Sequence, residues 1–135
     1  MKAALRTLAA VLIAMFVAFV LVNVVELFST VVHPFPADFK GTTEEICRHV
    51  EKYPQWILAV VVPVWAGTAL LSTWIARRIG TPYSSEIVGL ALMSALVFNL
   101  TKLPYPIWFN VANLLAIPAA IIAGSWLAIR RHTAG

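Results

Sequence analysis

Four long apolar runs constrain this chain more than any other feature of its sequence. They extend over residues 5–32, 53–76, 84–103 and 106–129. A helix needs about 20 predominantly apolar residues to cross the hydrocarbon core of a bilayer, and helices and closed barrels are the only structures that satisfy a lipid-exposed backbone. The sequence therefore predicts an all-α, polytopic membrane protein with four transmembrane helices, in which residues 1–135 form a single domain.

The amino-acid composition supports lipid as the main solvent. Hydrophobic residues make up 61% of the chain and charged residues 12%, against about 45–50% and about 25% in soluble domains. Lys2 and Arg6 precede the first run in the manner of a secretory signal. That run continues too far, however, and it ends without a small-residue cleavage site. We therefore interpret it as a retained transmembrane helix.

The basic residues predict the orientation of the chain. They lie before the first run, after the second and after the fourth, and these three places share one side of any four-span chain: Lys2, Arg6, Arg77, Arg78, Arg130, Arg131 and His132. Cytoplasmic segments are enriched in Lys and Arg, so both termini are expected in the cytoplasm, in a bacterial inner membrane or another plasma membrane. No basic stripe interleaved with aromatic residues is present, which argues against nucleic acid as a partner.

The connections between the runs predict how the helices are arranged. Residues 33–52 form an outer loop in which Thr42 and Glu45 match the capping-box spacing. Ile46, Val50 and Tyr53 follow at helical spacing, so this loop is expected to contain a short amphipathic helix on the outer surface. The connection LPYP between the third and fourth runs is short enough to require antiparallel neighbours. A compact antiparallel bundle is therefore expected.

Small residues at four-residue spacing are expected to bring helices close together, because apolar surface alone gives no drive to associate in lipid. One set lies in the first run, and a second lies in the fourth run at Ala112, Ala116, Ala120 and Gly124. The sequence leaves open whether the second set faces a helix of this chain, a second copy of the chain or a larger membrane-protein partner. The lipid bilayer is the partner that the composition requires.

Polar residues inside the apolar runs gather at one depth. Glu26 is the single carboxylate of the first run, and a charge at the centre of a membrane helix costs about 2.5–3.5 kcal/mol. With both termini in the cytoplasm, the polar residues of three runs fall near the outer face, where Lys102 is the expected partner of Glu26. The sequence therefore predicts an outward-facing ligand-binding pocket formed by Glu26, Asn23, Lys102, Asn99, Asn110, Asn113 and His33. The alternative is a structural network, in which the charged side chains extend to the headgroups and the asparagines join helices.

No catalytic or metal-binding motif accompanies these residues. The sequence contains no HExxH or GxSxG motif and no phosphate-binding or dinucleotide-binding loop. The single cysteine, Cys47, and the scattered histidines offer no metal-ligand spacing. Neither a metal nor a cofactor is therefore expected.

These features predict a module that binds or transports a small polar or ionic ligand, or a lipid headgroup. Pro63 and Pro118, each near the middle of a run, would give the helices points at which to bend. The main alternative is a non-catalytic accessory or assembly subunit of a larger membrane complex. An intramembrane enzyme that uses Glu26 and His33 on outer-leaflet lipids ranks last, because no recognised motif supports it.

Overall fold

The chain folds into helices joined by short connections. A computed structural model describes the backbone of residues 1–134 and the side chains of residues 1–130, so the side chains of Arg131 and His132 lie outside the described part. Within residues 1–134 there are five helices and no strand: α1 (Lys2–Val32), α2 (Thr43–Glu51), α3 (Gln55–Ile79), α4 (Pro82–Lys102) and α5 (Ile107–Ala134). Helices α1, α3, α4 and α5 are long and apolar enough to cross a membrane. The prediction of an all-α chain with four long apolar helices is confirmed.

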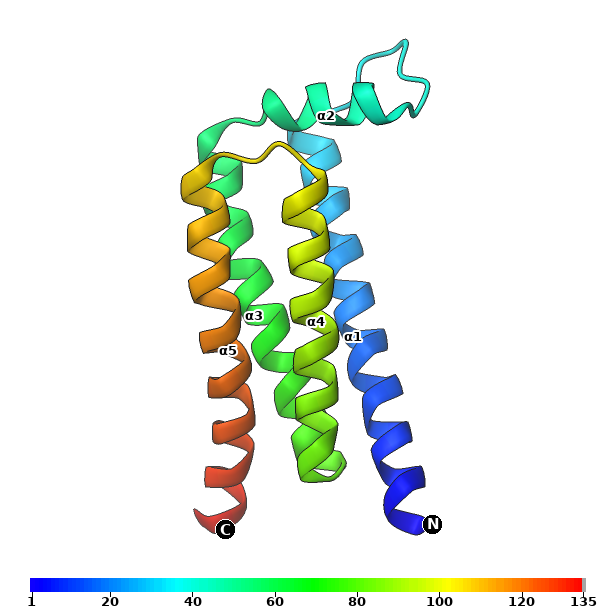
Figure 1. Cartoon of the computed structure of the whole chain (residues 1–135), viewed down its shortest axis with the longest axis vertical. Coiled ribbons are helices and arrows are strands. Elements are labelled where there is room, and N and C mark those ends of the chain that lie inside the picture. The colour runs from blue at the N-terminus through cyan, green and yellow to red at the C-terminus, as the bar shows by residue number, and fades with distance from the viewer. Residues whose placement is uncertain (135) are drawn as a thin grey trace.

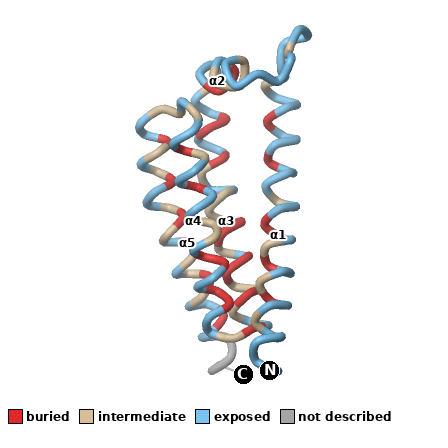
Figure 2. The backbone as a smooth tube through the Cα atoms, turned by 45° about the vertical axis from the view of Figure 1, so that its right-hand side comes forward, coloured by how far each residue is buried: buried red, intermediate tan, exposed pale blue. Residues whose placement is uncertain are grey.

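Helix α3 lies at the centre of the bundle. It packs against α1, α4 and α5, and α4 also packs against α1 and α5. Both termini and the α3–α4 turn lie at one end of the bundle, whereas α2 and the α4–α5 connection lie at the other (Figure 1). We call these the terminal end and the α2 end. In Figure 2 the buried residues follow the sides of the long helices that face one another.

Helix boundaries follow capping groups rather than the limits of the apolar runs. Helix α4 begins at Pro82, because the preceding Thr81 forms a capping box with Ser84 and proline is favoured in the first turn. Before α2, Thr42 accepts the expected hydrogen bond from the Glu45 backbone N–H. The Glu45 carboxylate, however, accepts from the backbone N–H of Lys40 at 2.7 Å. The capping box predicted before α2 is therefore formed in half.

The small residues of α1 face the bundle. Ala10, Ala14 and Ala18 are all buried. Ala10 lies beside Gly80 in the α3–α4 turn. A Cβ added to Gly80 would overlap the Ala10 side chain. At the same end, the Arg6 Nε–H donates to the carbonyl oxygen of Ile79 at 2.9 Å. The first half of α1 is therefore held firmly against the α3–α4 turn.

The small residues of α5 are divided between two environments. Gly124 approaches α3 so closely that a Cβ would overlap the Leu70 carbonyl oxygen and the Thr73 hydroxyl. Ala120 is buried with it, whereas Ala112 and Ala116 are half-buried. Two of the four small residues predicted to make close contacts, Ala120 and Gly124, are thus buried inside this chain.

Candidate ligand-binding site

A small cleft lies beside Glu26 at the α2 end of the bundle. Its volume is about 20 Å³, which is enough for one water molecule or a group of similar size. Helices α1, α3 and α5 and the segments that precede α3 and α5 all contribute to its lining, which includes Glu26, Ser29, Tyr53, Trp65, Tyr105 and Phe109. We call this space the Glu26 cleft.

Two tyrosines join Ser29 in providing the hydroxyl groups of the Glu26 cleft. Tyr53 and Tyr105 each directly precede a proline, and the residue before a proline is restricted to extended conformations. Burial raises the pKa of Tyr53, and the charge of Glu26 adds to the rise, while a hydrogen bond with Ser29 opposes it. Burial also raises the pKa of Tyr105, with further contributions from Glu26 and Tyr53. Both phenols therefore stay protonated and are available as hydrogen-bond donors.

A larger cavity lies next to the cleft, toward the middle of the bundle. Its volume is about 150 Å³, and all four long helices line it, through residues that include Val22, Trp65, Thr68, Ala95, Asn99 and Ile117. We call it the Asn99 cavity. Trp65 lines both spaces and forms a common wall between them.

The helical register stacks the two spaces along the bundle axis. On α5, Phe109 lines the Glu26 cleft and Ile117 lines the Asn99 cavity, with Asn113 between them at four-residue spacing. On α1, Val22 lines the cavity, and Glu26 lines the cleft one turn later. Residues four apart lie on the same face of a helix. A partly polar space near the α2 end therefore lies above a mostly apolar space.

Several buried polar atoms in this region have no hydrogen-bond partner among the described residues. Asn113 is fully buried; its Nδ2 donates to the Phe109 carbonyl oxygen at 2.9 Å, while its Oδ1 remains unpaired. Three further buried atoms also have no hydrogen-bond partner among the described residues: Trp65 Nε1, Asn99 Oδ1 and Asn110 Oδ1. An unpaired buried polar group costs about 1–3 kcal/mol. Of these residues, Trp65 and Asn99 line the Asn99 cavity, whereas Asn110 and Asn113 line neither space.

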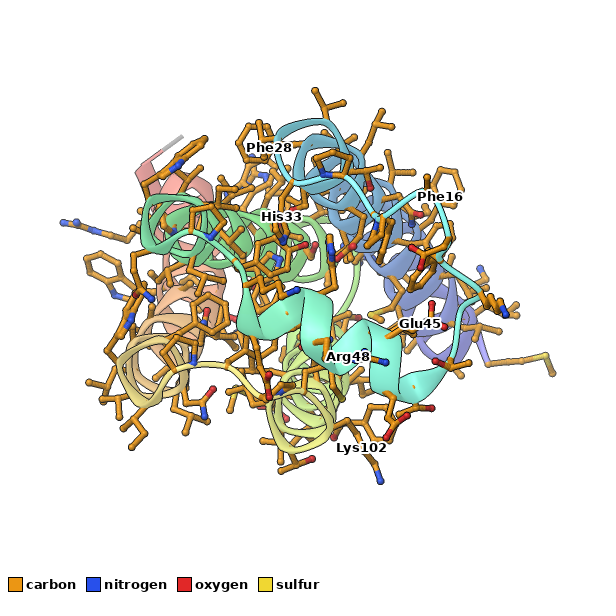
Figure 3. All side chains as sticks on the ribbon, turned by 90° about the horizontal axis from the view of Figure 1, so that it is seen from above. Phe16, Phe28, His33, Glu45, Arg48 and Lys102 are labelled. Atoms are coloured by element: carbon orange, nitrogen blue, oxygen red, sulfur yellow. The ribbon has the colours of Figure 1, made fainter. Side chains whose placement is uncertain are left out.

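Two of the predicted site residues lie apart from this region. Asn23 is exposed, and its Nδ2 donates to the Phe19 carbonyl oxygen at 2.7 Å. Lys102 is also exposed, and its Nζ lies 5.7 Å from the centre of the Phe98 ring. Figure 3 shows its side chain directed away from the bundle. The predicted pairing of Glu26 with Lys102 is therefore absent.

His33 belongs to a column of stacked rings that connects α2 with the Glu26 cleft. Its ring stacks on His49 of α2 at 4.2 Å between centroids, and His49 stacks on Phe35 at the same distance. The His33 Nε2–H donates to the backbone carbonyl oxygen of His49 at 3.2 Å. The Tyr53 ring contacts both His33, at 4.8 Å, and His49, at 5.4 Å. The column thus holds α2 beside Tyr53, which lines the Glu26 cleft.

We predict that α2 loosens from this column as the pH falls. Burial lowers the pKa of His49, and the charge of His33 lowers it further, against an opposing backbone hydrogen bond. Because the pKa is lower in the folded state, this stabilisation is complete above the ordinary histidine value of about 6.5 and is lost below it. Amide hydrogen exchange of residues 43–52, corrected for intrinsic rates, should be faster at about pH 5.5 than at about pH 7.5. In His49→Phe the two rates should agree.

The sequence did not single out four residues that line the cleft. Ser29 and Trp65 lie inside apolar runs, Tyr53 was used for the helical spacing of the outer loop, and Tyr105 lies in the LPYP connection. The Tyr-Pro pair at the start of both the second and the fourth run was the available signal. It places two phenols at the starts of two helices on the same side of the bundle.

The comparisons with known proteins leave the site to be interpreted from its own geometry. Protein-family models, curated protein sequences and solved structures were searched, and none of them matches this chain.

Proposed function

We propose that this chain is an integral membrane protein whose four long helices cross the bilayer in alternating directions as an antiparallel bundle. The lengths and hydropathy of α1, α3, α4 and α5 support this arrangement. The distribution of Lys and Arg favours cytoplasmic termini, in a bacterial inner membrane or another plasma membrane. Helix α2, which crosses above α1 and α4 in Figure 3, would then lie on the outer surface, and the Glu26 cleft would face outward.

The chain binds a small polar or ionic ligand in the Glu26 cleft. The observation that carries this proposal is the convergence of a carboxylate, a serine and two tyrosines from three separate segments of the chain. No salt bridge involves Glu26 in the part of the chain that the structure describes, since Lys102 lies elsewhere. Glu26 is exposed at the edge of the cleft, but a carboxylate without a partner is still costly inside a membrane-spanning helix. A bound group that donates hydrogen bonds or carries positive charge offsets that cost, and transport of that group is the natural extension.

The substitution Glu26→Gln tests this function. We expect ammonium, methylammonium or ethanolamine to raise the unfolding temperature of the wild-type protein in nanodiscs, and Glu26→Gln to reduce the ligand-induced rise severalfold. Binding of a ligand to the folded state alone stabilises that state in proportion to ligand occupancy. The matched control is Glu86→Gln, at an exposed position in the first turns of α4, which should retain the full rise. Equal rises in both variants, or no rise with any of the three compounds, would contradict the proposal.

The alternative function is that of an accessory or assembly subunit. It is favoured by the half-buried Ala112 and Ala116 of α5, which leave room for the close approach of a further helix. Recovery of a second membrane protein in fixed stoichiometry from mild detergent would support this alternative. Ligand stabilisation that depends on Glu26 would favour the binding function instead.

A further inference from the structure

We infer that the ligand is an alkylammonium ion, with its ammonium group in the Glu26 cleft and an apolar chain of about six carbons in the Asn99 cavity. This inference rests on the proposed function and adds the chemical class of the ligand. It follows from three features: the charge of the cleft, the size and lining of the cavity, and the position of one space directly below the other.

The cleft selects a cation. Glu26 is the charged residue of its lining, and the other polar contributions come from the neutral hydroxyls of Ser29, Tyr53 and Tyr105. An anionic group would be repelled by the carboxylate. Aromatic rings attract cations to their faces, and Trp65, Phe109 and the two tyrosines supply four rings.

The size of the cleft restricts that cation further. A volume of about 20 Å³ suits a group no larger than water. A primary ammonium group meets this limit, whereas a quaternary ammonium group carries three additional methyl groups and exceeds it. The three N–H groups of a primary ammonium can donate to the Glu26 carboxylate and to the hydroxyl oxygens.

The Asn99 cavity suits an apolar chain. Its walls are mostly aliphatic, with Val22, Leu92, Leu96 and Ile117 contributed by three helices. An apolar cavity of comparable volume, about 150 Å³, binds benzene in another protein, so about six carbon atoms fit the space. Thr68 and Asn99 are the two polar residues of this lining apart from Trp65, and the Thr68 hydroxyl already donates to the Val64 carbonyl oxygen at 2.9 Å.

The two spaces are placed to hold one molecule. Trp65 lines both of them, so a ligand that occupies both would pass beside this indole. At the edge of the cavity, Val22 is 40% exposed and Ala95 is also exposed. The chain of the ligand therefore enters from the side, between α1 and α4, while its charged end stays near the α2 end.

The test compares hexylammonium with methylammonium. Equilibrium binding of each radiolabelled ion is measured on the wild-type protein in nanodiscs, with empty nanodiscs subtracted. Transfer from water would favour each buried methylene by about fourfold in affinity. Lipid chains already compete for the cavity, so we expect hexylammonium to bind about tenfold more tightly in total. Hexanoate of the same chain length should not compete.

The substitution Ala95→Leu fills the cavity from its exposed edge without changing a buried residue. We expect it to remove the advantage of hexylammonium and to leave methylammonium binding within about twofold of wild type. The control is Ala119→Leu, which adds the same side chain at an exposed position of α5. Hexylammonium should keep its advantage in this control.

The outcomes separate the inference from the proposed function. Equal binding of both ions by the wild-type protein, with Ala95→Leu unchanged, would overturn the alkyl-chain site while leaving Glu26 as a cation site. Binding of hexanoate in place of hexylammonium would overturn the assignment of a cationic ligand. Failure of the wild-type protein to bind either ammonium ion would overturn the inference and the cation site together.

Discussion

Gly124→Ala is expected to lower the free energy of unfolding by about 2 kcal/mol, because it forces α5 away from α3. The new methyl group would overlap the backbone carbonyl oxygen of Leu70, which cannot turn aside as a side chain can. Overpacking of this kind costs about 1–3 kcal/mol or more. The higher helix propensity of alanine offsets up to about 1 kcal/mol of that loss. Reversible unfolding in mixed micelles measures the difference.

Gly67→Ala is the matched control for this substitution. Gly67 also lies inside a long helix, but an added Cβ there would have no neighbour within 4 Å. The helix-propensity term then acts alone, and the variant should be more stable than the wild type by up to about 1 kcal/mol. A Gly124→Ala variant as stable as Gly67→Ala would show that the two helices do not meet at this residue.

Phe109→Ala is expected to destabilise the protein by about 3 kcal/mol. Phe109 is fully buried, and its ring contacts those of Tyr105, Trp65 and Trp108 at 4.6, 5.6 and 5.9 Å. Truncation of a buried phenylalanine costs about 3–5 kcal/mol in soluble proteins. We expect the lower end of that range, because the unfolded reference state in a membrane is also apolar. Unfolding in mixed micelles again gives the value.

Leu115→Ala is the control for Phe109→Ala, because it removes an apolar side chain that is not packed inside the bundle. Leu115 is on the same helix and is 70% exposed, so its truncation should change the stability by no more than about 0.5 kcal/mol. Because Phe109 also lines the Glu26 cleft, Phe109→Ala should weaken methylammonium binding, whereas Leu115→Ala should not. Equal stability losses in the two variants would contradict the central position assigned to Phe109.

The sequence predicted the number of long helices better than their ends. Hydropathy identifies which residues prefer lipid, but a helix continues as long as its backbone hydrogen bonds can form. Arg77 and Arg78 end the second apolar run and still belong to α3. Pro82 precedes the third run and still begins α4, because Thr81 caps it.

Depth in the bundle was predictable, whereas rotation about each helix axis was not. Glu26 and Asn23 are three residues apart and were expected to face the same pocket. The buried side of α1 is fixed by Ala14, Ala18 and Val25. Glu26 and Asn23 are both exposed on this helix, but only Glu26 lies at the edge of the cleft. Which side of a membrane helix faces its neighbours depends on packing, and polar spacing alone does not determine it.

The column of rings around His49 has a consequence for how the protein assembles. All of its members, from His33 through Phe35 and His49 to Tyr53, lie within a short stretch of the chain. Contacts between residues close in sequence form faster than distant ones, because they close smaller loops. This group of rings can therefore form during synthesis, before α4 and α5 have left the ribosome. Tyr53 would then already be in position when α5 packs against the bundle.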